Sequence, residues 1–182
     1  SKTFVYSADK LIIMPIFGLT ILGQYQFGIQ ILTALSIIPL ILYNYLLPQH
    51  AGGKSNNKRL GTIELYGVIV SLILTVILIL AMPIIVNTFF SGFSNAIISS
   101  QIVVCAAIPL SISAICNSIL LSRERSSWVI MGAVIFLISQ YILIIILGAA
   151  FSLEGLAIAT VIASVVQAIF LYLARKRTLD KK

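Results

Sequence analysis

The sequence predicts an all-α integral membrane protein, built as a bundle of six transmembrane helices with both termini in the cytoplasm. Hydrophobic residues make up 60% of the 182 residues and charged residues only 9%, whereas soluble domains carry roughly 25% charged residues. The mean hydropathy is +1.12. The apolar residues also come in runs of about 20, the length that crosses a hydrocarbon core. Basic residues gather at alternate ends of these runs.

The expected spans follow the apolar runs in order along the chain. We place them at Phe4–Leu22, Phe27–Leu47, Leu65–Phe90, Ile102–Leu121, Trp128–Phe151 and Leu156–Ala174. They leave no room for a soluble domain, so residues 1–182 are expected to form a single six-helix transmembrane lobe. Only the connection Pro48–Thr62 is long, and its Pro, Gly, Asn and Ser content predicts a solvated loop.

The distribution of basic residues predicts the orientation. They lie in or beside the N-terminal region, the second and fourth connections and the C-terminal tail: Lys2, Lys10, Lys54, Lys58, Arg59, Arg123, Arg125, Arg175, Lys176, Arg177, Lys181 and Lys182. The connections Gly23–Gln26, Asn87–Gln101 and Ala149–Gly155 contain no Lys or Arg. Cytoplasmic loops carry the excess of these residues, so both termini are expected in the cytoplasm. Orientation and anionic lipid explain the net charge of +7, and nucleic acid is not expected as a partner.

Motifs for enzyme chemistry are weak, and we expect no enzyme activity, metal site or cofactor. Gly52–Ser55 reads GGKS like the end of a phosphate-binding loop, but Pro48 stands where that loop needs its first Gly. His50 has no neighbouring His, Cys or acidic cluster, so we expect a solvated loop histidine. Cys105 and Cys116 lie on one expected helix about 16 Å of rise apart, too far for a disulfide.

Asp9 and Lys10 lie inside the first expected span. A charge costs about 3 kcal/mol at the centre of a membrane helix and less towards its ends. With the helix ending at Leu22, Asp9 lies about 20 Å from the outer end and roughly 10 Å inside the cytoplasmic boundary. Two interpretations stay open. Either this half-helix borders a hydrated cavity open to the cytoplasm, or the helix begins late and both charges lie among the headgroups.

A polar stripe in the second expected span favours the cavity. Its members recur on one helical face: Gln26, Gln30, Thr33 and Asn44. A polar stripe in a membrane helix should face protein or water. Asn117 and Gln140 add polar groups in the fourth and fifth spans, where bonds between helices are the ordinary role.

Prolines and small residues mark bending and packing. Four of the six expected spans contain a proline: Pro15, Pro39, Pro83 and Pro109. Each removes a backbone hydrogen bond and should bend its helix, as suits a bundle that changes shape. In the last span Gly155, Ala159 and Ala163 recur at a spacing that lets helix backbones approach closely. We expect a packing surface there.

Several short motifs resemble a known family. DKLII at Asp9–Ile13, LGQY at Leu22–Tyr25 and LLP at Leu46–Pro48 resemble the opening of the second half of polysaccharide flippases. These are the O-antigen and teichoic-acid type exporters of the multidrug/oligosaccharidyl-lipid/polysaccharide superfamily. LSRER at Leu121–Arg125 resembles the family's turn between helices ten and eleven, and EGLAIAT at Glu154–Thr160 resembles the start of its twelfth helix. Ser152 stands where the family often has Gly.

The resemblance implies a function. The chain would be the C-terminal lobe of a MATE-like transporter that flips a lipid-linked oligosaccharide or polysaccharide precursor across the cytoplasmic membrane by alternating access. The start at Ser1 agrees with a fragment, so the expected partner is a missing N-terminal lobe or a second copy. The implied substrate-cavity residues are Asp9, Lys10, Gln26, Gln30 and Asn44, with Asn117 and Gln140 as further candidates.

The two charged residues receive separate roles from the resemblance. Lys10 would attract the pyrophosphate of the lipid carrier, while the polyprenyl tail stays in the bilayer. Asp9 would fix Lys10 or take part in coupling to an ion, H⁺ or Na⁺.

Two other functions fit the same residues. The first is an ion-coupled small-molecule (multidrug) exporter of the same superfamily, in which transport depends on Asp9 and not on Lys10. The second is a non-transporting membrane scaffold, in which the prolines and the polar stripe serve packing alone. Substitutions at Gln30 and Asn44 would then cost stability and nothing else.

Overall fold

The computed structural model describes the backbone of residues 2–51 and 57–179 and the side chains of residues 13–50 and 60–178. In this part of the chain every element is a helix: α1 (Lys2–Leu35), α2 (Ile37–Ala51), α3 (Asn57–Phe89), the 3₁₀ helix η1 (Ser91–Ala96), α4 (Ile97–Val104), α5 (Ala107–Ser122) and α6 (Ser126–Leu179). Four helical stretches are long and apolar enough to cross a membrane: Ile13–His50, Leu60–Phe89, Ser91–Ser122 and Ser126–Thr178. The predicted all-α membrane class is confirmed at this level.

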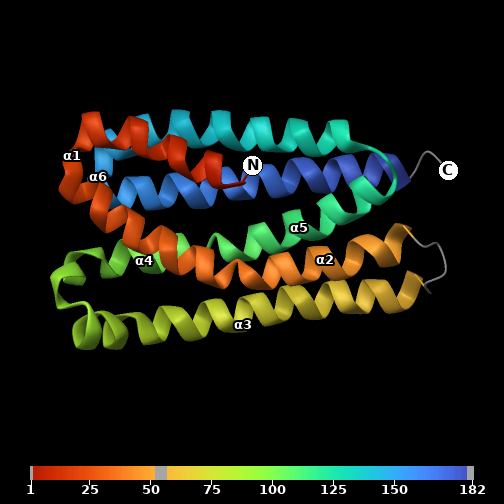
Figure 1. Cartoon of the computed structure of the whole chain (residues 1–182), viewed down its shortest axis with the longest axis horizontal. Helices are drawn as coiled ribbons and strands as arrows, with labels where there is room; N and C mark the ends of the chain where they lie inside the picture. The colour runs from red at the N-terminus through yellow and green to blue at the C-terminus, as the bar shows by residue number, and fades with distance from the viewer. Residues whose placement is uncertain (1, 52–56, 180–182) are drawn as a thin grey trace.

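Helices α1 and α6 each turn back on themselves at one residue. Gly18 has φ 83° and ψ 170°, and Ser152 has φ 48° and ψ −121°. Figure 1 shows the chain reversing at these two helices at the same end of the bundle. Each helix therefore has two antiparallel arms, residues 2–17 and 19–35 in α1 and residues 126–151 and 153–179 in α6.

The turn in α1 corrects the expected boundary. The connection was expected at Gly23–Gln26, but these residues are helical and the turn lies at Gly18. Glycine has no Cβ, so Gly18 takes a positive φ without steric cost. Residues on both sides of it continue in helical conformation, which satisfies their backbone groups without water.

The other connections are also shorter than expected. α2 extends to Ala51 and α3 begins at Asn57, so much of the expected loop Pro48–Thr62 is helical. Within Asn87–Gln101 the chain forms the end of α3, then η1 and the start of α4. Within Ala149–Gly155 only Ser152 departs from helical backbone angles. Polar composition at these places did not stop the helices, because a continuing helix bonds its own amides and carbonyls.

Two prolines follow interruptions in the helices. α1 ends just before Ser36, three residues ahead of Pro39, and α4 ends just before Cys105, four residues ahead of Pro109. Proline has no amide hydrogen, so the carbonyl four residues earlier loses its helical donor. Near Pro109 the amide of Ile108 donates instead to the carbonyl of Cys105 at 3.3 Å. These two breaks agree with the expected bends.

The remaining two prolines differ from each other. Pro15 lies three residues before the turn at Gly18. Pro83 lies inside α3, which runs from Asn57 to Phe89 with no interruption. The sequence predicted a bend at every proline, but Pro83 does not break α3.

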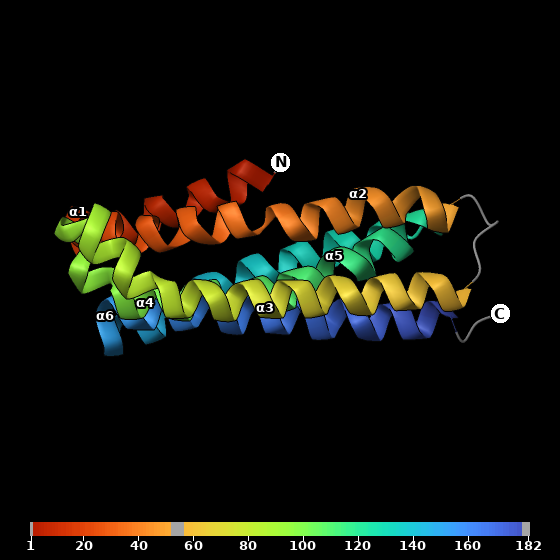
Figure 2. The same cartoon turned by 90° about the horizontal axis from the view of Figure 1, so that it is seen from below.

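Helices α4 and α5 form the centre of the bundle. α5 packs against α2, α3 and α6, and α4 packs against α1, α3 and α6, as Figures 1 and 2 show. In the core, Ser111 Oγ lies 2.8 Å from Ser71 Oγ of α3 and donates to the carbonyl of Ala107 at 2.9 Å. These bonds satisfy hydroxyls that are buried away from water.

The small residues of α6 pack as the sequence predicted. Ala159 and Ala163 are 0% exposed, and Gly155 is buried. A Cβ on Gly155 would collide with the backbone of Leu147 in the other arm of α6. Small side chains permit this close approach between helix backbones. The expected packing surface is confirmed.

Strain at Ser152 gives the first testable prediction. Its backbone angles suit glycine, and such positions cost other residues about 1–3 kcal/mol. Replacing Ser152 by Gly should therefore raise the free energy of unfolding by about 1 kcal/mol, measured by thermal unfolding in detergent. The matched control is Ser139→Gly inside the first arm of α6, which should lower the free energy of unfolding by about 0.5 kcal/mol. A loss of stability in both variants would contradict strain at Ser152.

Candidate functional site

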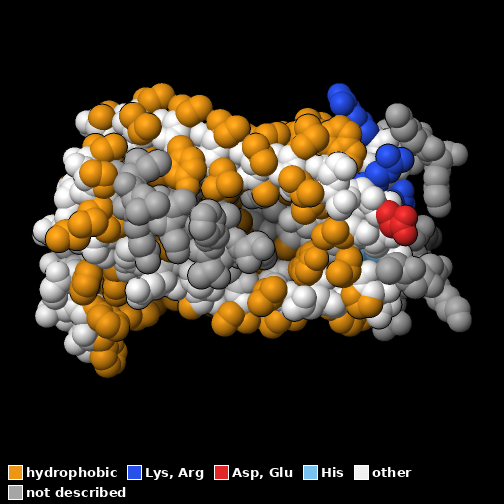
Figure 3. Space-filling model, turned by 45° about the horizontal axis from the view of Figure 1, so that its top comes forward, with side chains coloured by type: hydrophobic (Ala, Val, Ile, Leu, Met, Phe, Trp, Pro, Cys, Tyr) orange, Lys and Arg blue, Asp and Glu red, His pale blue; other side chains and the backbone are white. Residues whose placement is uncertain are grey.

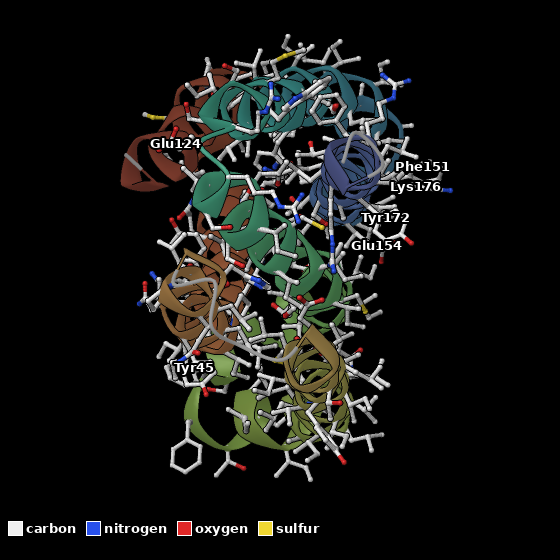
Figure 4. All side chains as sticks on the ribbon, turned by 90° about the vertical axis from the view of Figure 1, so that its right-hand side faces the viewer. Tyr45, Glu124, Phe151, Glu154, Tyr172 and Lys176 are labelled. Atoms are coloured by element: carbon white, nitrogen blue, oxygen red, sulfur yellow. The ribbon has the colours of Figure 1, made fainter. Side chains whose placement is uncertain are left out.

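An exposed face with polar side chains runs along the second arm of α1 and along α2. Gln30, Thr33 and Asn44 are exposed on it, with Ile37 and Leu40 exposed between them. We call these five residues the polar face. Figure 4 shows Tyr45, next to Asn44 in sequence, pointing outward from α2. The stripe seen in the sequence thus lies on the outside of this chain.

The depth of the polar face follows from the helical rise. Counted from the turn at Gly18, Gln30 lies about 18 Å along the helix, and Asn44 lies about 39 Å along it. A hydrocarbon core is about 30 Å thick. Gln30 is therefore at the depth of the core, and Asn44 is near the opposite boundary.

An exposed amide at core depth needs a partner. A polar group left without hydrogen bonds in hydrocarbon costs several kcal/mol. Elsewhere the exposed surface of the helices consists largely of hydrophobic side chains (Figure 3). Thr33 meets this need within its own helix, since its hydroxyl donates to the carbonyl of Ile29 at 2.7 Å. Within the described part of the chain the amide of Gln30 makes no such bond, so this part of the face requires water or another protein surface.

The side chains of Asp9 and Lys10 lie outside the described residues, while their backbone is part of α1. Asp9 precedes Gly18 by nine residues, about 14 Å of rise. The sequence placed Asp9 about 20 Å from that end, because it assumed a helix that ended at Leu22. The turn at Gly18 thus moves this position towards the middle of a core of about 30 Å, to a depth similar to that of Gln26.

Gln26 and Asn117 are half-buried and each has an atom without a bonding partner. Among the described side chains, no hydrogen bond reaches Gln26 Nε2 or Asn117 Oδ1. Ser113, one turn before Asn117 on α5, has a buried hydroxyl in the same condition. A buried polar atom left unbonded costs about 1–3 kcal/mol. These atoms are places where water or a ligand would be stabilised.

Gln140 belongs to a buried network and not to the polar face. It is 2% exposed, and its Nε2 lies 3.3 Å from Tyr25 Oη and 3.2 Å from Thr160 Oγ1. The two hydroxyl oxygens are 2.9 Å apart. The network joins the second arm of α1 to both arms of α6. It holds in place the arm that carries Gln30.

A charged cluster joins three helices at the end of the bundle that carries the C-terminus. Glu64 of α3 accepts a hydrogen bond from Arg175 of α6, with 3.0 Å between Oε2 and Nη2. His50 of α2 has its Nε2 3.4 Å from Glu64 Oε1, an electrostatic contact too long for a strong hydrogen bond. Arg123 adds a bond from Nη1 to the carbonyl of Thr178 at 3.2 Å.

This cluster corrects the expectation for His50. The sequence predicted a solvated loop histidine, but His50 lies in the last turn of α2 with its side chain 15% exposed. The sequence signal that we missed is Glu64, an acidic residue near the start of a long apolar run, which requires a cationic neighbour. Nothing local identifies that neighbour, because Arg175 is 111 residues away along the chain.

Metal and disulfide chemistry find no support within the described part of the chain. No group of three His, Cys, Asp or Glu side chains among residues 13–50 and 60–178 could hold a metal ion. Cys105 and Cys116 are both free.

Comparisons with protein-family models, with curated proteins and with solved structures found no match. The resemblance to polysaccharide flippases therefore depends on the short sequence motifs alone.

The buried network around Gln140 gives a prediction about stability. Gln140→Leu removes the amide that bonds Tyr25 and Thr160 and should lower the free energy of unfolding by about 1–2 kcal/mol. Thermal unfolding in detergent measures this. Gln30→Leu makes the same change at an exposed position and should leave stability unchanged. Equal stability of the Gln140 variant and the native protein would show that the network does not support the fold.

The charged cluster gives a third prediction. Glu64→Gln keeps the shape of the side chain but removes the charge that pairs with Arg175, so stability should fall by about 2 kcal/mol. Glu154→Gln, at an exposed position of α6, is the matched control and should change stability little. The same unfolding assay compares the two. A loss as large at Glu154 as at Glu64 would contradict a special role for the cluster.

Proposed function

We propose that this chain forms a six-pass lobe of a transporter that moves a lipid-linked oligosaccharide or polysaccharide precursor across the cytoplasmic membrane by alternating access. The exposed polar face of α1 and α2 carries the proposal. The turns at Gly18 and Ser152 support six passes, since they divide α1 and α6 into antiparallel arms. The second arm of α1 continues into α2 as one pass, α3 is another, and η1, α4 and α5 together make a further one.

The proposed orientation has both termini in the cytoplasm. Among the described side chains, Lys and Arg gather at the end of the bundle where the C-terminus lies (Figure 3): Arg123, Arg125, Arg175, Lys176 and Arg177. The exposed phenyl rings of Phe89 and Phe90 lie at the C-terminal end of α3, at the end of the bundle away from the C-terminus of the chain (Figure 1). A basic cytoplasmic side and aromatic rings at a membrane boundary are the usual pattern of multi-pass proteins.

A second lobe would cover the polar face in this proposal. It would be the N-terminal lobe of the same protein or another copy of this chain. Transporters of this kind rock one lobe against another around a shared cavity. The helix breaks at Ser36 and Cys105 support such movement, because each is close to a proline and has fewer helical hydrogen bonds to lose when the helix bends.

The substrate class follows from the chemistry of the face and from the resemblance. Gln30 and Asn44 offer amide donors and acceptors to sugar hydroxyls. Lys10 would attract the pyrophosphate, and Asp9 would fix Lys10 or take part in coupling to H⁺ or Na⁺. The polyprenyl tail would remain in the bilayer. The depth of Asp9, about 14 Å from the turn at Gly18, agrees with a hydrated cavity and disfavours a position among the headgroups.

The exposure of Gln30 and Asn44 favours transport over a scaffold. A scaffold would use such residues for bonds between helices of the lobe, but neither is packed inside it. Their substitution should therefore affect transport and not the stability of the chain. An ion-coupled small-molecule exporter would share the face and would differ in its dependence on Lys10.

The double variant Gln30→Ala, Asn44→Ala tests the proposal. We expect about a tenfold or larger loss of flipping, the effect of one or two lost hydrogen bonds to the moving substrate, with unchanged insertion and thermal unfolding. The measurement follows a fluorescent polyprenyl-pyrophosphate-linked oligosaccharide in vesicles that contain the complete transporter. Gln49→Ala, an exposed amide on α2 outside the polar face, is the control and should flip normally.

Two outcomes would contradict the proposal. Unchanged flipping in the double variant would remove the polar face from the substrate path. Reduced stability with unchanged flipping per folded molecule would mean that the polar face serves packing alone. Lys10→Ala, assayed for oligosaccharide flipping and for export of small molecules, separates the two transporter types, because only an exporter of small molecules should tolerate it.

A further inference from the structure

A groove lies between the two arms of α6 at the basic end of the bundle. It has a volume of about 170 Å³ and is lined by Trp128 of the first arm and by Phe170, Leu173, Ala174 and Arg177 of the second. The rings of Trp128 and Phe170 lie 5.9 Å apart between centroids and are tilted by 47°. The four lining residues of the second arm recur at steps of three and four, which places them on one helical face.

The size and chemistry of the groove limit what it can hold. Pockets for drug-sized molecules span about 300–1,000 Å³, and this groove measures about 170 Å³. The walls are aromatic and aliphatic, and the guanidinium of Arg177 is the charged group among the lining residues. A sugar would find few hydrogen-bond partners there. A lipid would match both features, with a segment of its hydrocarbon chain against the apolar walls and the phosphate of its headgroup beside Arg177.

The surroundings of the groove place it at a membrane boundary. Leu173, Ile169 and Tyr172 are 52%, 55% and 55% exposed, so the surface beside the groove is apolar and open. Tryptophan and tyrosine concentrate at the level of the lipid headgroups. Arg125, the residue just before α6 and three residues before Trp128, is exposed and adds positive charge at the same end of the bundle. Anionic lipids gather at such basic membrane boundaries.

We propose that this groove binds one anionic phospholipid. Its acyl chain lies against Trp128 and Phe170, and its phosphate accepts hydrogen bonds from Arg177. Guanidinium groups bind phosphate through two parallel charge-assisted bonds. In a headgroup without net charge a cationic amine offsets the phosphate charge and is repelled by Arg177, so an anionic lipid is preferred. The lipid contacts both arms of α6 at the end opposite the Ser152 turn and so holds the open end of this hairpin together. The site is independent of the transport function proposed above.

Native mass spectrometry of the full chain in detergent tests the site. The probes are dioleoylphosphatidylglycerol and dioleoylphosphatidylcholine, which share their acyl chains and differ in headgroup charge. We expect dioleoylphosphatidylglycerol to bind about fivefold or more tightly than dioleoylphosphatidylcholine. Arg177→Gln should remove that preference, as the loss of one charge-assisted pair implies. Lys176→Gln removes the same charge at the adjacent residue, whose side chain points away from the bundle (Figure 4), and should keep the preference.

A second variant tests the apolar half of the groove. Leu173→Trp adds bulk at the half-exposed edge and keeps every charge, so it should weaken binding of both lipids by a similar factor. Far-ultraviolet circular dichroism verifies that each variant is folded. Equal effects of the Arg177 and Lys176 substitutions would mean that the lipid is attracted by the overall positive charge at this end of the bundle. That result would overturn the site. Equal binding of the two lipids to the native protein, or no effect of Leu173→Trp, would overturn it as well.

Discussion

Backbone amides and carbonyls inside a hydrocarbon layer must bond within the chain, and the rest of this structure depends on that constraint. It explains why the helices run through most of the expected connections. It also limits where the chain can leave the helix. Within the described residues the helices are interrupted at Gly18, Ser36, Cys105–Ala106 and Ser152. The chain also leaves the α-helix at η1 with its flanking residues and in the turn between α5 and α6. At Ser36 the hydroxyl donates to the carbonyl of Leu32 at 2.8 Å.

The polar side chains fall into two groups because of the same constraint. Inside the lobe, atoms of Gln26, Ser113 and Asn117 have no partner among the described side chains, while two sets of residues bond to each other: Gln140 with Tyr25 and Thr160, and Glu64 with Arg175. They join helices and are best understood as supports. The amides of Gln30 and Asn44 lie on the outside. The cost of the Gln30 amide in lipid is relieved only by water or by another protein surface, and this contrast is the physical basis of the proposed transport function.

The two arms of α6 pack differently at the two ends of the hairpin. At one end Ser152 accepts a backbone conformation suited to glycine, and Gly155 allows the arms to approach closely. At the other end the arms separate enough to leave the groove beside Trp128 and Arg177. A strained tight turn and an open end thus belong to one hairpin. The lipid that we propose for the open end would complete its packing.

The sequence by itself determined the all-α membrane class, the apolar stretches, the small-residue packing of α6 and the common face of Gln30, Thr33 and Asn44. Composition and helical spacing are local properties, so one sequence is enough to identify them. The tertiary structure alone decided that α1 turns at Gly18, because apolar helix-forming residues continue on both sides and no local pattern favours one turn over the other. It also decided the partners of His50 and Gln140. These partners lie on other helices, and Arg175 is 111 residues from Glu64, so only the packing of the helices brings these residues together.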